Sequence, residues 1–140
     1  MSETIHATCV AIDGRAVLIA GPSGSGKSDL ALRLLDRGAV LVSDDYTIVE
    51  LRKGRLTASP PVAIAGKIEI RGVGIVERPC VREVPVALLV DLTQPPERLP
   101  EPRSTTIVGI ALPTVAVSAL EASAPIKVEA ALLQQGLASS

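Results

Sequence analysis

The segment from residue 18 to residue 35, LIAGPSGSGKSDLALRLL, constrains the fold of this chain more than any other. Residues 21–28, GPSGSGKS, match the pattern G-x-x-x-x-G-K-[ST], with a short apolar run before them and a leucine-rich run after them. Glycines let backbone N–H groups turn toward phosphate oxygens, and the N-terminus of a following helix adds partial positive charge. The segment therefore predicts a strand, a phosphate-binding loop and a helix in direct succession.

This loop also carries the two side chains that nucleotide chemistry requires. Lys27 is expected to reach the β- and γ-phosphates of ATP, and the Ser28 hydroxyl to ligate Mg²⁺. A purely structural glycine turn is the alternative, but it needs neither a lysine nor a hydroxyl here. The loop alone would suit a GTPase, a transport ATPase or a kinase equally. The predicted nucleotide-binding residues are Gly21, Pro22, Ser23, Gly24, Ser25, Gly26, Lys27 and Ser28.

A hairpin precedes the loop. Residues 5–12 and 15–21 are rich in strand-forming residues and flank Asp13-Gly14, the dipeptide typical of a type I′ turn. If Ile12 pairs with Arg15, paired residue numbers sum to 27, and His6 lies opposite Gly21 at the start of the phosphate loop. A lone histidine is usually incidental, so this register is what makes His6 a candidate site residue.

A helix over residues 28–38 and a buried strand over residues 39–43 follow the loop, and this strand ends in Asp44-Asp45. Strand ends of α/β proteins carry ligand-binding groups. A carboxylate there could hold Mg²⁺ or accept a proton from an attacking hydroxyl, as in kinases. The alternative is a simple turn. Asp91, after the apolar run VALLV, is a weaker rival for the same role.

The rest of the chain predicts further strands and one closing helix. Residues 46–59 indicate a hairpin around Lys53-Gly54, and the run from Thr93 to Ser104 is too rich in proline to be anything but an exposed loop. Residues 67–76 alternate, with Glu69 between Lys67 and Arg71 on one strand face, which is either a solvated face or a site. The remaining expected elements are strands at 84–92 and 105–118 and a helix at 126–136.

Composition excludes several classes of function. Tyr46 is the only aromatic residue and the net charge is -1, so a nucleic-acid-binding surface is not expected. No apolar run is long enough to span a membrane and the N-terminus has no signal-peptide pattern, so we expect a cytoplasmic protein. Cys9 and Cys80 are expected to be buried thiols in a reduced compartment.

Taken together, these segments resemble the catalytic domain of HPr kinase/phosphorylase, the bacterial enzyme that phosphorylates a serine of the phosphocarrier protein HPr. The resemblance rests on IH, GPSGSGKSDLAL, RGAVLVSDD and above all IEIRGVGIV, in matching order and spacing, and VREVPVALLVDL with ERL extends it to about residue 100. It implies one α/β domain over residues 1–140, with a P-loop kinase-like fold, a mixed and strand-rich sheet and a P-loop helix.

The resemblance also implies a role for each matching residue. Asp45, with Asp44 beside it, matches the carboxylate that acts as base in phosphorylation and as acid in the reverse reaction, and His6 matches the histidine that assists it. Asp91 is left with a structural role. The other matches are Lys27 to the P-loop lysine, Ser28 and Glu69 to the two magnesium ligands, and Arg98 to the arginine that contacts the transferred phosphoryl group.

Three departures from the family pattern limit what the resemblance implies. Only five residues precede His6, where the family has a whole N-terminal domain; ERPCVR replaces a longer glycine-rich segment; and SALEASAPIKVEAALL stands where the family has a Pro-Val-x-x-Gly-Arg-Asn run. Dephosphorylation, homo-oligomer formation and allosteric control stay open. The expected partner is HPr or a related phosphocarrier, with a small-molecule kinase or a non-catalytic ATP sensor as alternatives.

Overall fold

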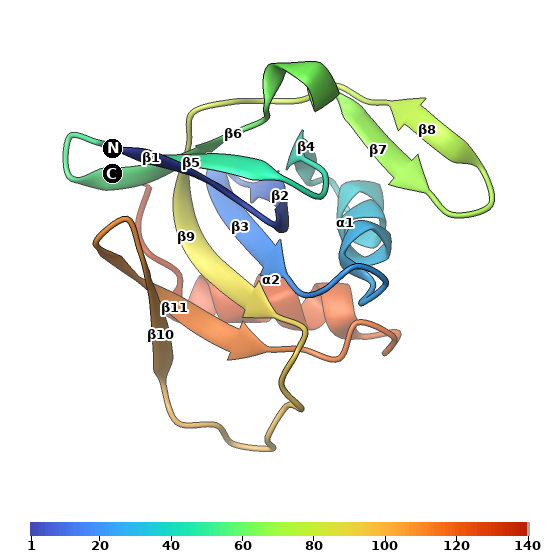
Figure 1. Ribbon diagram of the computed structural model, residues 1–140. Coiled ribbons are helices and arrows are strands. Elements are labelled where there is room, and N and C mark those ends of the chain that lie inside the picture. The colour runs from blue at the N-terminus through green and yellow to red at the C-terminus, as the bar shows by residue number, and fades with distance from the viewer. Residues whose placement is uncertain (140) are drawn as a thin grey trace.

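A computed structural model describes residues 1–139, and most of its regular structure is strand (Figure 1). The elements in chain order are β1 (Ser2–Ile5), β2 (Ala7–Ile12), β3 (Arg15–Ala20), α1 (Lys27–Asp36), β4 (Val40–Ser43), β5 (Thr47–Arg52), β6 (Arg55–Ser59), a 3₁₀ turn (Val62–Ile64), β7 (Lys67–Ile70), β8 (Gly74–Glu77), β9 (Val84–Asp91), β10 (Arg103–Ile107), β11 (Ile110–Ala116) and α2 (Ala124–Gln135). This agrees with the predicted mixed, strand-rich α/β fold.

The main sheet is mixed, and its strands lie in the order β1-β5-β6-β9-β3-β2-β4, with β11 paired to β9 and β10 to β11. Strands β3, β9 and β11 run parallel, and β4 runs in the same direction because β2 is antiparallel to both β3 and β4. The carboxyl ends of β4, β3, β9 and β11 therefore lie along one edge of the molecule. This is where ligands bind in open α/β sheets.

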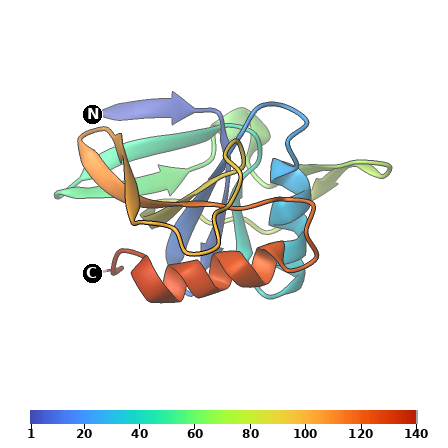
Figure 2. The same ribbon diagram turned by 90° about the horizontal axis from the view of Figure 1, so that it is seen from below.

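Successive side chains of the central strands are buried on opposite faces of the sheet. Val17 and Ile19 of β3 belong to the apolar cluster covered by both helices, whereas Leu18 belongs to a second cluster with Val49 of β5 and Leu56 of β6. Figure 2 shows the helices on one side of the central strands and β1, β5 and β6 on the other. Burial on both faces explains why these strands are apolar throughout rather than alternating.

The predicted hairpin before the phosphate loop is confirmed. Asp13 and Gly14 have φ values of 50° and 78°, and the pairing runs from Ile12↔Arg15 to Ala7↔Ala20. The pairing ends there, so the expectation that His6 pairs with Gly21 is wrong. The expected single strand over residues 5–12 is broken at His6, because β1 turns away from β3 to pair with β5.

Two further runs expected as single strands are hairpins instead. Residues 67–76 form β7 and β8, joined by a turn at residues 71–73 in which Gly72 has a φ of 86°, so Arg71 lies in the turn and not on the strand face. Residues 105–118 contain a turn at Val108-Gly109 between β10 and β11. Alternation looks the same along one strand as along two strands that pair, so the signals of these turns were glycines, Gly72 and Gly74 in the first run and Gly109 in the second.

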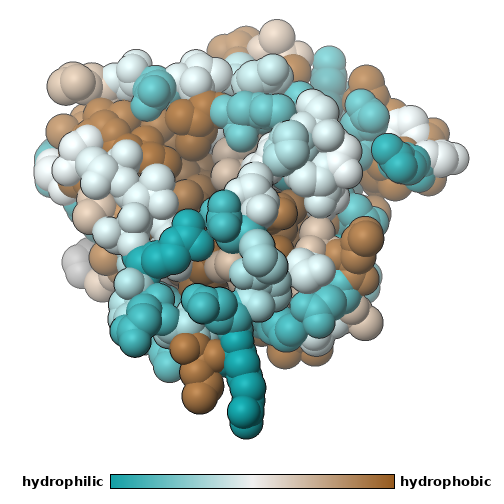
Figure 3. Space-filling view, turned by 60° about the horizontal axis from the view of Figure 1, so that its bottom comes forward, coloured by the Kyte–Doolittle hydropathy of each residue, from teal (hydrophilic) through white to brown (hydrophobic). Residues whose placement is uncertain are grey.

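The segments that connect the elements lie at the surface. The proline-rich loop of residues 92–102 projects from the body of the molecule (Figures 1 and 3), and most of its residues are exposed, as predicted. The predicted loop extended to Ser104, but Arg103 and Ser104 begin β10. Cys9 is buried in β2, but Cys80 is exposed in the link between β8 and β9, so the prediction of two buried thiols is wrong for Cys80. Within residues 1–139, no helix is both long and apolar enough to cross a membrane.

Candidate active site

The phosphate loop lies between the end of β3 and the start of α1, at the edge where the parallel strands end. Gly24 and Gly26 have φ values of 84° and 99°, which ordinary L-residues rarely adopt, so glycine is required at both positions. A Cβ built on Gly26 would also lie 2.9 Å from the Cβ of Ala119. Glycine at position 26 is thus favoured both by the backbone conformation and by the close approach of Ala119.

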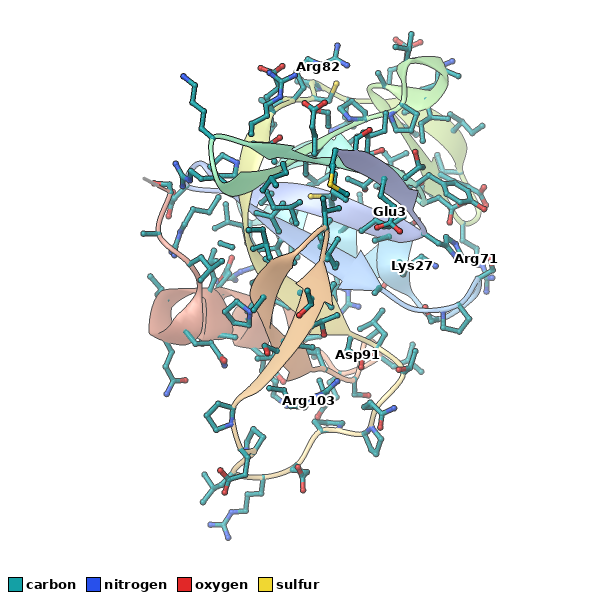
Figure 4. All side chains as sticks on the ribbon, turned by 60° about the vertical axis from the view of Figure 1, so that its left-hand side comes forward. Glu3, Lys27, Arg71, Arg82, Asp91 and Arg103 are labelled. Carbon is teal, nitrogen blue, oxygen red and sulfur yellow. The ribbon has the colours of Figure 1, made fainter. Side chains whose placement is uncertain are left out.

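Two polar side chains of the loop point inward. Lys27 is only 5% exposed, and its Nζ donates to the carbonyl oxygens of Gly21 at 2.7 Å and Pro22 at 3.2 Å. Figure 4 shows Lys27 at the start of α1. The Ser25 hydroxyl is buried and has no hydrogen-bond partner within the part of the chain that the structure describes. A buried ammonium group and an unpartnered hydroxyl suit an anion with several oxygen atoms.

Asp44 is buried at the end of β4, and its carboxylate contacts three other elements. Its Oδ1 accepts hydrogen bonds from Ser28 Oγ at 2.5 Å and Thr8 Oγ1 at 3.2 Å, and its Oδ2 accepts one from the backbone N–H of Glu69 at 3.0 Å. The residue is 7% exposed. These three donors join α1, β2 and β7 to the end of β4, so Asp44 is held in one position beside the loop.

Asp45 has a very different environment from its neighbour. It is exposed, its Oδ1 lies 2.9 Å from His6 Nε2, and its backbone N–H donates to Thr8 Oγ1 at 3.0 Å. Its φ is 67°, and the Tyr46 N–H donates to the Asp44 carbonyl across it at 2.7 Å. A three-residue turn of this kind is rare and strained, and such strain concentrates at functional sites.

His6 is fixed by two contacts. Its ring stacks on Tyr46 with centroids 5.0 Å apart and an interplanar angle of 24°, while Nε2 meets Asp45. His6 reaches Asp45 at the bend between β1 and β2 and does not pair with Gly21, so its expected position beside the phosphate loop stays a prediction. The stack and the hydrogen bond together orient the imidazole toward the exposed carboxylate.

Glu69 and Arg98 are less closely tied to this group. The Glu69 side chain is exposed, and only its backbone contacts Asp44. Arg98 lies exposed on the loop after β9, and no hydrogen bond or ion pair among residues 1–139 joins it to the other predicted site residues. No cluster of three or more histidine, cysteine or acidic side chains suited to a metal occurs in that range.

Asp91 ends β9 and has partners outside the phosphate loop (Figure 4). Its Oδ1 accepts from the Thr93 backbone at 2.8 Å and from the Thr93 hydroxyl, and its Oδ2 lies 3.2 Å from Arg103 Nη2. Burial alone would raise the pKa of Asp91, but the hydrogen bonds from Thr93 and Arg103 outweigh it and hold that pKa below its usual range. These contacts agree with the structural role expected for Asp91.

The sequence analysis missed two residues of the site, Thr8 and Tyr46. Thr8 bridges Asp44 and the Asp45 backbone, and Tyr46 stacks on His6. Thr8 is two positions after His6, so on a continuous strand it would share a face with it, which was an available signal. Tyr46 is the sole aromatic and directly follows the two aspartates, but nothing in the sequence shows which ring it meets.

Three comparisons with known proteins bear on this site. The family model described as HPr Serine kinase C-terminal domain matches residues 1–130. Curated relatives named HPr kinase/phosphorylase include one from Clostridium tetani, 41% identical over 75 residues, and one from Brevibacillus brevis, 49% identical over 76 residues. Each match covers 54% of this chain but only 25% and 24% of the relative, so the chain spans about a quarter of their length.

A solved structure extends the similarity to nearly the whole chain. The Hpr(Ser) kinase/phosphatase from Coxiella burnetii superposes with a TM-score of 0.82 at 30% sequence identity, over 94% of this chain and 88% of that chain. At this coverage the structural match includes most of the segment from β9 to α2.

Proposed function

The chain belongs to the HPr serine kinase C-terminal domain family, and from this premise we propose that it transfers the γ-phosphoryl group of ATP to a serine of HPr or a similar small phosphocarrier protein. The observation that carries the proposal is the pair of adjacent aspartates in opposite environments beside a phosphate loop. Asp44 is buried and fully hydrogen-bonded, and Asp45 is exposed and paired with His6.

The two carboxylates differ in exposure, which supports a different role for each in the reaction. A general base must reach the acceptor, and only Asp45 is exposed enough to meet a serine of another protein. We assign it that role, with His6 holding the carboxylate in position through their hydrogen bond. Asp44, which accepts the Ser28 hydroxyl, organises the phosphate side.

In the proposed reaction, the acceptor serine oxygen attacks the γ-phosphorus and the bond from that phosphorus to the β–γ bridging oxygen breaks. The serine proton passes to Asp45, and ADP leaves with the bridging oxygen. The loop N–H groups and Lys27 hold the β- and γ-phosphates in line. The Coxiella protein is named a phosphatase as well as a kinase, and a reverse reaction of this kind would use the protonated Asp45 as acid.

The oxygen donors near the loop fit a magnesium ion. The Ser28 hydroxyl and the Asp44 carboxylate lie 2.5 Å apart, and both are hard oxygen donors of the kind Mg²⁺ prefers, while Glu69 contacts Asp44 through its backbone N–H. When bound, the ion would neutralise charge on the phosphates. We assign Ser28 and Glu69 as its ligands and expect Arg98 to contact the phosphoryl group when the loop after β9 approaches it.

The test is phosphoryl transfer from labelled ATP to an HPr-like protein, with the product serine located by mass spectrometry. Asp45→Asn should lower the transfer rate by about 10²–10⁴-fold, the contribution of a positioned general base. Asp36→Asn, an exposed aspartate at the far end of α1, is the matched control and should transfer at the wild-type rate. Normal transfer by the Asp45→Asn variant would remove the proposed base.

A further inference from the structure

The segment between β11 and α2, residues 117–123, forms a second wall of the phosphate loop. The Val117 N–H donates to the Asp91 carbonyl at 3.2 Å, which carries the chain along the end of β9, and Ala119 then packs directly on Gly26. Figures 1 and 2 both show this segment beside the start of α1. Ala119 is buried, whereas the next residue, Leu120, is 91% exposed.

The two flanks of the phosphate loop differ in chemistry. On the β4 side lie Asp44, Asp45 and His6, which are the groups proposed for transfer. On the other side, beyond β9, lies β11 with the segment of residues 117–123. In ATP the γ-phosphate and the nucleoside lie at opposite ends of the phosphate chain. If the γ-phosphate faces Asp45, the nucleoside therefore leaves the loop on the side away from Asp45. That direction leads over Ala119 and Leu120.

Arg33 holds this segment in shape. It reaches from α1 to donate through Nη2 to the Ala119 carbonyl and through Nη1 to the Glu121 carbonyl at 3.0 Å, and it is paired with Asp29 at 3.0 Å. Two backbone carbonyls on either side of Leu120 are thereby anchored to the helix that follows the phosphate loop. The exposed leucine is therefore presented from a turn that is anchored on both sides.

We propose that residues 117–123 bind the base and ribose of the nucleotide, with Leu120 packing against the base and Arg33 as the positioning residue. This rests on the proposed function, because it concerns the ATP that the kinase would use. Aliphatic side chains bind a base through its flat apolar faces. In a chain whose one aromatic side chain stacks on His6, a leucine is the available group for this contact.

The experiment compares ATP with inorganic tripolyphosphate, which has the phosphates but no nucleoside, by titration calorimetry in the presence of Mg²⁺. Leu120→Ala should weaken ATP binding by about tenfold, as expected for loss of a partly buried leucine side chain, and leave tripolyphosphate binding unchanged. Leu133→Ala, a leucine of α2 that is 80% exposed, is the matched control and should change neither. Arg33→Gln should reproduce the ATP-selective loss.

The outcomes separate this inference from the proposed function. Equal binding of ATP and tripolyphosphate by the wild-type chain, or a Leu120→Ala variant that binds ATP normally or loses both ligands alike, would overturn the base-binding role. Lys27→Ala should weaken both ligands. If the wild-type chain binds neither ligand, the proposed kinase function fails and this inference falls with it.

Discussion

The left-handed backbone of Asp45 predicts an unusual order of stability among its variants. At most positions alanine is more stable than glycine, because glycine loses about 0.5–1 kcal/mol more conformational entropy on folding. At Asp45 the φ of 67° would cost an alanine about 1–2 kcal/mol, and glycine does not bear that cost. Both variants lose the His6 contact, so that loss cancels when they are compared.

The difference between these terms makes Asp45→Gly more stable than Asp45→Ala by roughly 0.5–1 kcal/mol, or about 2 °C in Tm for a chain of this size. Thermal and urea unfolding of the two variants measure it directly. The control is Ala130→Gly, at an exposed position inside α2, which should lower stability by about 1 kcal/mol. If Asp45→Ala melts at or above Asp45→Gly, the residue is not held in the left-handed region and the strain argument is refuted.

Three further predictions concern other parts of the molecule. Gly26→Ala should abolish ATP binding and lower Tm by several degrees, since its Cβ would clash as well as strain the backbone. Gly54→Ala, also at a positive φ but with open space around it, should keep ATP binding in the same titration. In native protein, Cys80 should react with a maleimide at neutral pH and Cys9 should not, because Cys9 is buried and its thiol pKa is raised; labelling of Cys9 should need denaturant. The pKa of Asp91 is lowered in the folded state, so its ionised form stabilises the fold at pH values above the ordinary pKa of about 3.9. This stability is lost as the pH falls through the pKa of the folded state. The difference in unfolding free energy between wild type and Asp91→Asn should therefore be constant from about pH 5 to 8 and shrink below about pH 4.

Local sequence signals predicted those parts of the fold that depend on a single turn or a single helix. Asp13-Gly14 predicted both the turn and the register of β2 with β3, because a two-residue turn leaves little freedom in the pairing. Gly38 predicted the end of α1, where its φ of 107° is one that only glycine adopts easily. The pattern of residues 21–28 predicted the loop conformation in the same way, because Gly24 and Gly26 have positive φ values that other residues rarely adopt.

Contacts between distant segments could not be predicted in this way. The pairing of β1 with β5 joins residues that are 42 to 48 positions apart, from Ile5↔Thr47 to Ser2↔Glu50, and nothing within β1 indicates its partner. The environments of Asp44 and Asp45 likewise depend on Thr8 and His6, which are 36 and 39 positions away in the chain. The sequence therefore predicted that carboxylates lie near the loop, but not which of them is exposed.

The strained turn at Asp45 would let two consecutive carboxylates serve the proposed reaction. In an extended strand, adjacent side chains point to opposite faces of the sheet, so a straight continuation of β4 would turn Asp45 away from the side that Asp44 faces. The positive φ at Asp45 breaks this alternation. Thr8 of β2 contacts both Asp44 and the Asp45 backbone, and His6, between β1 and β2, contacts the Asp45 carboxylate. Without that turn, the proposed base and the group that organises the phosphate side would lie on opposite faces, and a longer spacing between them would be needed. The strain is therefore best understood as the condition for using neighbouring residues in two different roles.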